Sequence, residues 1–535
     1  MCFISLNINA QSYRSAYGWT SAEVVHIVTD AQNNTYVAIG FSGTKDFDPG
    51  PGVTNLTASS DGSMALCKYD SLGVFVFAKK LPTRDRNADL EIDSQGNIYF
   101  SSDFYETVDL NPGSGSFTVS SFNNFQIPQS INADDVYVVK LNANGDFIWG
   151  KRFGTIYADG IQIDLSIDDE LIIVLDYRGT LYLQTVPVTT YNSGSDYNMA
   201  IFSLDVNGEI TWLHDVGGSN EDDSANHLEV TPNGEFLVTG TFSGTTDLDP
   251  GPGTASYTAN SADAFIARYD MEGNFLNARI YGGPGVQFGN RCFERNGSLY
   301  ASLIYDTQID ADAGAGVYAF EQDSVGRYIF LKDSLEFGLQ WALELPFGDT
   351  EGFVNVMSQN QIHVDPLGNI YAGFDFTRTT QVAVNNQMTT LSPLGVIDGI
   401  LCKVNATGSI AWFKRYGGEP DDINPEGYYY STAAVALKGP NHLVFGGNMQ
   451  GTCDFDQGIG DGFVTTITSG NNTYLATLEL VPDPGDLDGD GEVTSLDIEI
   501  LISNLGCTTC SELDLNSDNL ITVVDIMLYL DLIDG

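Results

Sequence analysis

Residues 33–40 read NNTYVAIG, a turn of small polar residues followed by an apolar stretch, and this pattern recurs along the chain. The other copies are GNIYFSS at 96–102, DELIIVL at 169–175, GEFLVTG at 234–240, GSLYASL at 297–303, GNIYAGF at 368–374 and NHLVFGG at 441–447. The turn residues are Asn33, Gly96, Asp169, Gly234, Gly297, Gly368 and Asn441. These residue types tolerate the positive φ that a hairpin turn needs. Seven copies, spaced 63 to 73 residues apart, predict a protein of seven repeated units.

A second turn trails the first in most units, in stretches such as NANGDFIWGK at 142–151 and DVNGEITWLH at 205–214. Between the two turns lie alternating stretches such as DVYVVKLN at 135–142, whose period of two predicts half-buried strands. Each unit therefore holds about four strands, and no convincing amphipathic helix interrupts residues 12–480. Trp149, Trp212, Trp412 and Trp341 share one repeat position. We expect them to pack between neighbouring units, with stacking on a sugar as the alternative.

Four-stranded units without helices suit a closed ring better than an open stack, because radial closure leaves few exposed edges. The seventh unit ends at NNTYLATLEL (471–480) without its closing strand, while SYRSAYG at 12–18 resembles the end of such a strand. The sequence therefore predicts a mainly β fold, a seven-bladed β-propeller closed by an N-terminal strand. The units resemble the β-propeller repeats of large secreted bacterial proteins, the SBBP repeats, and this resemblance covers most of the chain.

The charge of the chain excludes one class of partner. Lys and Arg total 22 against 71 Asp and Glu, a formal net charge of -49, whereas binding to a phosphate backbone requires the opposite sign. Nucleic acid is therefore not expected, and no apolar run is long enough for a membrane span. Such acidity is best tolerated where divalent cations or salt screen the self-repulsion, as outside a cell.

The chain divides into four predicted segments. Residues 1–11, MCFISLNINAQ, look like the remnant of a secretory signal peptide. Residues 12–480 form the propeller, 481–485 (VPDPG) a short linker, and 486–535 a small calcium-binding module. A signal sequence predicts a secreted, extracellular or cell-surface protein, and an ordinary strand beginning at Met1 is the alternative reading of the first residues.

The last fifty residues contain two acidic twelve-residue loops, 486–497 and 514–525. Calcium needs six to eight oxygen ligands, and EF-hand loops supply them from positions 1, 3, 5, 7, 9 and 12. The predicted ligands are Asp486, Asp488, Asp490, Glu492 and Asp497 in the first loop, and Asp514, Asn516, Asp518, Leu520 and Asp525 in the second. Glu492 and Leu520 would contribute backbone carbonyls, and Thr494 and Thr522 stand at position 9. Each loop precedes an apolar helix, so the sequence predicts a small α-helical domain with two Ca²⁺ sites.

The module resembles a dockerin in three features. Each loop has Asp at position 12, one helix follows each loop, and the module lies at the end of the chain. This resemblance implies binding to a cohesin-like partner through positions 10 and 11, here Ser495 with Leu496 and Val523 with Val524. These pairs are more apolar than the usual Ser and Thr of the family. The departure leaves metal binding as the firmer expectation.

Related acidic loops recur in the propeller at 46–52, 109–115, 247–253 and 454–460, with a degenerate copy at 310–316. Their alternate acidic side chains could bind further calcium ions. Alternatively, the side chains cap backbone amides and Pro-Gly fixes a turn.

No catalytic motif is present, and the five histidines are scattered singly, most of them expected on the surface or in turns. The first hypothesis is a secreted, non-catalytic calcium-binding protein. Its propeller would be a platform for carbohydrate or protein, and its C-terminal module would attach it to a cohesin-like protein or a cell-surface component. The alternatives are a polysaccharide-degrading enzyme, a glycoside hydrolase or lyase that carries a dockerin, and a structural surface protein.

Overall fold

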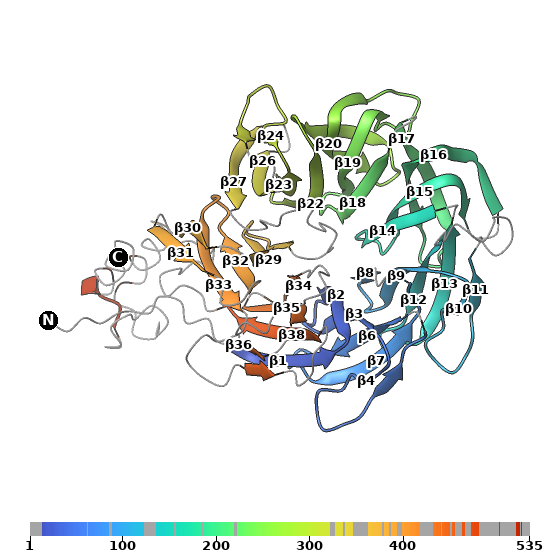
Figure 1. Ribbon diagram of the computed structural model, residues 1–535, viewed down its shortest axis with the longest axis horizontal. Coiled ribbons are helices and arrows are strands. Elements are labelled where there is room, and N and C mark those ends of the chain that lie inside the picture. Colours follow the sequence, from blue (N-terminus) through green and yellow to red (C-terminus); the bar gives the residue numbers. More distant parts are fainter. Residues whose placement is uncertain are drawn as a thin grey trace.

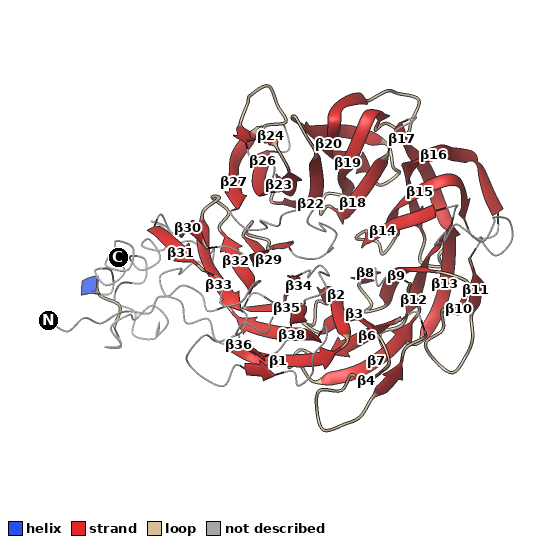
Figure 2. Cartoon of the chain, viewed as in Figure 1, coloured by secondary structure: helices blue, strands red, loops and turns tan. Residues whose placement is uncertain are grey.

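The computed structural model describes residues 13–480 with gaps, and the C-terminal positions 502, 505, 520–524 and 526. The gaps are 61, 85–87, 122–134, 155–156, 184–185, 219–221, 322–326, 335–337, 346–361, 377–378, 385–386, 393–397, 417–431, 440, 450–451, 455–462 and 466–471. Within the described part of 13–480 the regular structure is β throughout (Figure 2).

Antiparallel pairing arranges the described strands in consecutive groups of four, named units 1 to 7 here. Unit 1 contains β2 (Ala22–Thr29), β3 (Thr35–Phe41), β6 (Ser63–Tyr69) and β7 (Phe75–Leu81). Unit 2 contains β8 (Ala88–Ile92), β9 (Ile98–Phe104), β12 (Asp135–Leu141) and β13 (Phe147–Gly154). Unit 3 contains β14 (Tyr157–Leu165), β15 (Leu171–Leu183), β16 (Val186–Leu204) and β17 (Ile210–Gly218). Unit 4 contains β18 (Asp223–Val230), β19 (Glu235–Asp247), β20 (Ser256–Asp270) and β21 (Phe275–Tyr281).

The remaining units follow the same order. Unit 5 contains β22 (Gln287–Arg295), β23 (Ser298–Tyr305), β26 (Arg327–Ser334) and β27 (Leu339–Leu345). Unit 6 contains β28 (Ile362–Val364), β29 (Ile370–Phe376), β32 (Asp398–Val404) and β33 (Ile410–Tyr416). Unit 7 contains β34 (Thr432–Leu437), β35 (His442–Met449), β38 (Asn472–Glu479) and the N-terminal strand β1 (Tyr13–Thr20), which pairs with β38. Short cross-unit pairings of β13 with β15 and of β17 with β19 join units 2, 3 and 4 into one twelve-stranded sheet.

Short hairpins extend the second and third strands of several units. They are β4–β5 (Thr44–Asp46, Asn55–Thr57), β10–β11 (Thr107–Asp109, Thr118–Ser120), β24–β25 (Gln308–Asp310, Ala319–Glu321), β30–β31 (Thr380–Val384, Gln387–Leu391) and β36–β37 (Thr452–Asp454, Phe463–Thr465). In unit 4 the long strands β19 and β20 take the place of such a hairpin.

The units follow one another around a common centre, with first strands such as β2, β8, β14, β18 and β22 nearest to it (Figure 1). The buried side chains form seven clusters among the described residues, and each cluster joins two consecutive units. One of them joins unit 7 to unit 1 through Val444 and Val37. The predicted class, a mainly β propeller, is confirmed. The exact number of blades and the closure of the ring stay predictions.

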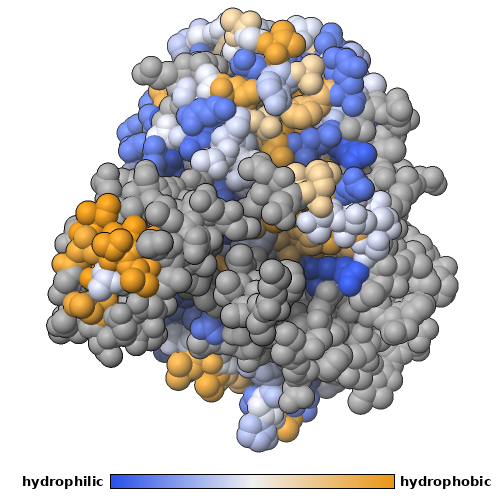
Figure 3. Space-filling model, turned by 90° about the vertical axis from the view of Figure 1, so that its left-hand side faces the viewer, coloured by the Kyte–Doolittle hydropathy of each residue, from blue (hydrophilic) through white to orange (hydrophobic). Residues whose placement is uncertain are grey.

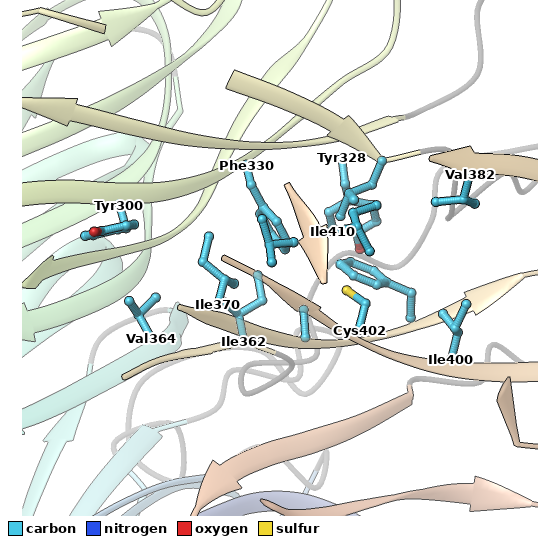
Figure 4. Packing of buried hydrophobic residues seen from close by; sticks show 14 of the residues in the cluster. Tyr300, Tyr328, Phe330, Ile362, Val364, Ile370, Val382, Ile400, Cys402 and Ile410 are labelled. Carbon is cyan, nitrogen blue, oxygen red and sulfur yellow. The ribbon is translucent and has the colours of Figure 1, made fainter. Parts of the chain in front are cut away.

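Packing on both sheet faces corrects one expectation from the sequence. β12 was expected to be half-buried because its residues alternate in polarity, but all seven of them are buried. Each sheet lies between two neighbours, so the polar positions of the third strands are covered too. Lys140 of β12, for example, lies over the Tyr99 ring with its Nζ 4.6 Å from the ring centroid. Figure 4 shows the same kind of interface between units 5 and 6, where Tyr328 and Phe330 pack toward Ile400 and Cys402.

The repeated tryptophans also pack between units, as expected. Trp149 in unit 2 donates a hydrogen bond of 3.1 Å from Nε1 to the Val206 carbonyl oxygen in the second turn of unit 3. Trp341 in unit 5 donates one of 2.8 Å to the Ala406 carbonyl oxygen of unit 6. The tryptophan of one unit therefore covers the turn of the next.

Candidate functional site

Polar and charged residues occupy equivalent positions on the first strands of successive units. Four of these strands carry a β-bulge, at Val25, Gly160, Asn226 and Asn290. Bulges re-aim the side chains beside them and occur often next to functional sites. One residue on the first strand of each of units 1 to 5 occupies an equivalent register position opposite the second strand of its unit. These residues are His26, Asp89, Gln162, His227 and Arg291, and all five are buried. We call these five residues and the charged residues packed around them the axial cluster.

One close polar contact of the axial cluster bridges units 1 and 2. His26 Nε2 lies 2.9 Å from Asp89 Oδ1, and Asp89 Oδ2 accepts a hydrogen bond of 2.8 Å from the Ile163 amide of unit 3. Burial pushes the pKa of the Asp89 carboxyl up, but His26 and this amide outweigh it and hold the pKa below its usual value. Asp89 is therefore the ionised acid of the cluster.

Three further acids of the cluster behave differently. Glu91 on β8, Asp164 on β14 and Glu229 on β18 come from units 2, 3 and 4 and are each partly buried. Burial raises the pKa of all three carboxyl groups, and repulsion between them raises it further in Glu91 and Asp164. Neighbouring carboxylates that cannot all ionise together share protons. In its protonated form, each of these acids can donate as well as accept a hydrogen bond.

Basic residues of unit 5 face these acids. Arg295 donates from Nη1 to Glu229 Oε1 at 2.5 Å and from Nε to the Val364 carbonyl oxygen of unit 6 at 3.1 Å. Burial and the positive charges of Arg291 and Arg295 lower the pKa of His227. The same causes lower the pKa of His363 on β28 to about 3. Both imidazoles are therefore neutral at physiological pH. Unlike the acids, they add hydrogen-bonding capacity without charge.

The sequence did not reveal this cluster. His26 and His227 are buried and His363 lies on a first strand, so the expectation that most histidines occupy surfaces or turns is wrong for these three. The residues of the axial cluster lie one or more units apart in sequence. Only the packing of the first strands around a centre brings them together. A regular offset from the repeated turn is the signal that could have located them.

The acidic loops at 46–52, 109–115, 247–253 and 310–316 are capped turns, and the copy at 454–460 lies almost wholly outside the described residues. Asp46 Oδ1 accepts hydrogen bonds from the Asp48 and Thr54 amides at 3.1 and 2.8 Å, and Asp48 Oδ1 accepts one from the Gly50 amide at 2.8 Å. The same bonds recur around Asp109 with Asn111, Asp247 with Asp249, and Asp310 with Asp312. The sequence allowed either a calcium site or a turn capped by its acidic side chains, and the described loops have the hydrogen bonds of the capped turn. Among the residues that the structure describes, no group of three or more His, Cys, Asp or Glu side chains is placed to hold a metal ion.

The predicted calcium ligands lie almost wholly outside the described residues. Asp486, Asp488, Asp490, Glu492, Asp497, Asp514, Asn516, Asp518 and Asp525 are not described, and neither are Thr494, Ser495 and Leu496. Leu520 is described and exposed. Thr522, at position 9 of the second loop, accepts a hydrogen bond of 3.1 Å on Oγ1 from the Val524 amide, as an N-cap residue does. The described residues of the helix therefore begin where the loop pattern predicts.

Comparison with protein families identifies this module. Residues 484–531 match the family model of the dockerin type I domain. The C-terminal segment is a dockerin type I domain. The predicted resemblance is thereby confirmed for this part of the chain, whereas the SBBP resemblance of the propeller stays a prediction.

The rest of the chain has more distant likenesses. The regulatory protein FlaEY of Caulobacter vibrioides is 24% identical over 482 residues, which cover 86% of this chain and 46% of that protein. The chain thus spans less than half of this relative. Among solved structures, the Dos1 propeller is 8% identical with a TM-score of 0.38, covering 87% of this chain and 95% of that one. An ulvan lyase, described as a polysaccharide lyase, is 10% identical with a TM-score of 0.43, covering 84% and 96%.

The described part of the dockerin domain exposes several large apolar side chains. Val523 and Val524 are 62% and 51% exposed, and Ile502 and Leu505 are exposed as well. Figure 3 shows a group of hydrophobic residues gathered on the face of the molecule that it presents. Exposed apolar patches of this kind mark protein interaction surfaces. No helix among the described residues has the length and hydrophobicity to cross a membrane.

Proposed function

We propose that this is a secreted or cell-surface calcium-binding protein whose dockerin domain attaches a propeller to a cohesin-like partner. The observation that carries the proposal is the dockerin type I match at 484–531, which contains both twelve-residue acidic loops. Two Ca²⁺ ions would order the loops and the helices that follow them. The propeller would then serve as a non-catalytic platform for carbohydrate or protein.

The exposed pair Val523 and Val524 supports a protein partner for the dockerin domain. The pair stands at positions 10 and 11 of the second loop, directly after the capping residue Thr522. An apolar pair in this place favours a partner surface that buries it rather than one that only forms hydrogen bonds. A cohesin-like domain with an apolar contact surface fits best.

The experiment is a surface-binding measurement of the full chain on an immobilised type I cohesin domain, with calcium or with a chelator. We expect a complex in calcium that is lost on chelation. The double variant Asp486→Ala with Asp514→Ala should abolish it, because each substitution removes the first ligand of one loop. A complex of equal strength with chelator, or no complex with any cohesin domain tested, contradicts the proposal.

A second candidate function is polysaccharide cleavage, and the coupled acids of the axial cluster favour it. An acid whose pKa is raised can protonate a leaving group while a neighbouring ionised acid acts as base or nucleophile. Glu91 and Asp164 would share the first role and Asp89 the second. Incubation of the full chain with acidic and neutral polysaccharides, followed by detection of new reducing ends, distinguishes this candidate from the platform. Glu91→Gln should abolish any activity found.

A further inference from the structure

Arg291 of unit 5 differs from Arg279 of unit 4, the other arginine that is buried among the described residues. Its side chain is buried, with the residue 6% exposed, yet it donates no hydrogen bond and forms no ion pair within the described part of the chain. Arg279, which is 1% exposed, donates to Asp333 and to the Ser334 carbonyl oxygen. A guanidinium carries five donors, and the nitrogens of Arg291 are not among the fully buried polar atoms that lack a partner in the described part of the chain, so they reach solvent. These donors are therefore available to a partner outside the chain.

The charges that act on Arg291 show which way it faces. Asp89 and Glu91 of unit 2 and Glu229 of unit 4 favour its charged form, although burial lowers the pKa of Arg291 to about 10. Unit 2 and unit 5 are not neighbours, so their residues can meet only near the centre, where Figure 1 places β8 and β22. Arg291 also follows the bulge at Asn290, which turns the strand locally. Its side chain thus belongs to the axis and not to an interface between two sheets.

The chemistry of the surroundings narrows the class of ligand. A guanidinium matches a carboxylate in a bidentate pair. A bare anion would be repelled by the carboxyl groups around Arg291, and a cation would be repelled by Arg291 itself. A ligand with hydroxyl groups beside its carboxylate avoids both conflicts, because hydroxyls donate hydrogen bonds to carboxylates.

We propose that the axial cluster binds a sugar acid, with Arg291 pairing with the ligand carboxylate and Glu91, Asp164 and Glu229 binding its hydroxyl groups. This inference deepens the platform part of the proposed function, since it names the class of ligand. The neutral imidazoles of His227 and His363 stand on the strands to either side of β22. Because these imidazoles are neutral, they would distinguish little between charged and uncharged ligands. Arg291 would then be the main determinant of specificity for the ligand carboxylate.

Binding of such a ligand should take up protons. The added negative charge raises the pKa of nearby acids further, so affinity should increase as pH falls. The titratable or charged groups around Arg291 are His26, Asp89, Glu91, Asp164, His227, Glu229, Cys292, Glu294, Arg295 and His363. A divalent cation held by the same acids would bind more weakly at low pH, the opposite trend.

The test is calorimetry of the full, calcium-loaded chain with D-glucuronate, its methyl glycoside, D-glucose and acetate. We expect glucuronate to bind, with glucose and acetate at least tenfold weaker because each lacks one half of the recognition. A methyl glycoside that binds as well as the free acid indicates the end of a saccharide chain, and one that fails indicates the free sugar acid. Either result agrees with the proposed site.

Arg291→Gln should lower the affinity for glucuronate at least tenfold, and Arg291→Lys should restore only part of it. Lys151→Gln is the matched control, because Lys151 also carries one positive charge but pairs with Glu209 at the exposed rim. If Arg291→Gln does not fold, the pH dependence of affinity and the ligand series, both measured on the unmodified chain, still test the proposal. Absence of binding up to about 10 mM glucuronate, equal binding by Arg291→Gln, or affinity that falls at low pH overturns the inference. None of these results depends on cohesin binding. The sugar-acid site and the attachment to a cohesin-like partner can therefore be contradicted independently.

Discussion

Asp263 in the third strand of unit 4 and Gly282 just after the end of the fourth strand stand opposite each other, and only a glycine leaves room for the buried carboxylate. A Cβ at position 282 would lie 2.5 Å from Asp263 Oδ2, and Asp263 is 4% exposed. The same relationship joins Asp135 to Gly154 and Asn198 to Gly217, with closest approaches of 2.3 and 2.6 Å. In unit 1, where the acid is replaced by Ser63, the opposite residue is Pro82. The recurring glycine is therefore a consequence of the Asp or Asn side chain opposite it.

Gly282→Ala should destabilise the propeller by about 1–3 kcal/mol, because the new methyl group must displace a buried carboxylate. The free energy of unfolding in urea measures this. Asp263→Ser is the companion variant, and Gly282→Ala should cost much less in that background. A double-mutant cycle that shows no coupling between the two positions contradicts the proposed cause.

These examples show how far the sequence could predict the fold. The repeated turns and the period of two gave the four-stranded unit, and NNTYLATLEL without a closing strand pointed to the role of β1. The glycine after the fourth strand was visible in the sequence, but its reason was not, since Asp263 lies 19 positions earlier. Register between paired strands decides that contact, and composition alone does not encode it.

The axial cluster was beyond sequence reasoning for a different reason. Asp89 contacts His26 of one neighbouring unit and acts electrostatically on Arg291 of a distant one, and these residues lie 63 and 202 positions away in the sequence. Such contacts depend on the angle between consecutive units and on the bulges of the first strands. By contrast, the ligands of a calcium loop lie within twelve consecutive residues, so local spacing suffices to predict them.

Gly273→Ala should destabilise the chain more than Gly234→Ala. Both glycines of unit 4 have a positive φ, +79° and +75°, so the backbone strain of the substitution is similar. A Cβ at 273 would lie 2.7 Å from the Trp212 ring and 2.5 Å from His214, whereas nothing lies within 4 Å at 234. The difference, about 1–2 kcal/mol, measures how closely the tryptophan covers the turn. Equal losses in thermal unfolding of the two variants would contradict this role of Trp212.

Asp223 should make stability depend on pH between about 4 and 6. Burial raises its pKa from 3.8 to about 6, although Thr246 and the Gly218 amide bind its oxygens at 2.6 and 2.7 Å. Since the folded pKa of this acid is the higher one, its contribution is most favourable below pH 4 and is lost as pH rises to 6. Relative to Asp223→Asn, the unmodified chain should lose up to about 3 kcal/mol of unfolding free energy over this range.

The control for this titration is Asp222→Asn, which removes the same charge from the exposed neighbour. Its stability difference from the unmodified chain should change little over the same range. Urea unfolding at pH 4, 5, 6 and 7 measures both variants. A constant difference between Asp223→Asn and the unmodified chain over the whole range counts against the raised pKa.

Removal of calcium should unfold the dockerin domain and leave the propeller intact. The domain has 12 carboxylates and no Lys or Arg between 486 and 535, so repulsion opposes folding until metal binds. Calorimetry should show two Ca²⁺ ions per chain, and Asp514→Ala should leave one. A chelator should reduce the helical circular dichroism signal while the thermal transition of the β part persists. An unchanged helical signal would contradict the coupling of metal binding to folding.

Val524→Asp should weaken the cohesin complex at least tenfold without changing calcium uptake. Val524 is 51% exposed, and burying it against a partner contributes through the hydrophobic effect, whereas a buried aspartate without a partner charge is costly. Ile167→Asp is the matched control, because Ile167 is 87% exposed in a turn of unit 3 and carries no proposed contact. Binding to the immobilised cohesin domain and calcium calorimetry measure the two effects separately. If Val524→Asp binds as tightly as Ile167→Asp, the apolar pair is not the contact surface, and the partner must reach the domain elsewhere.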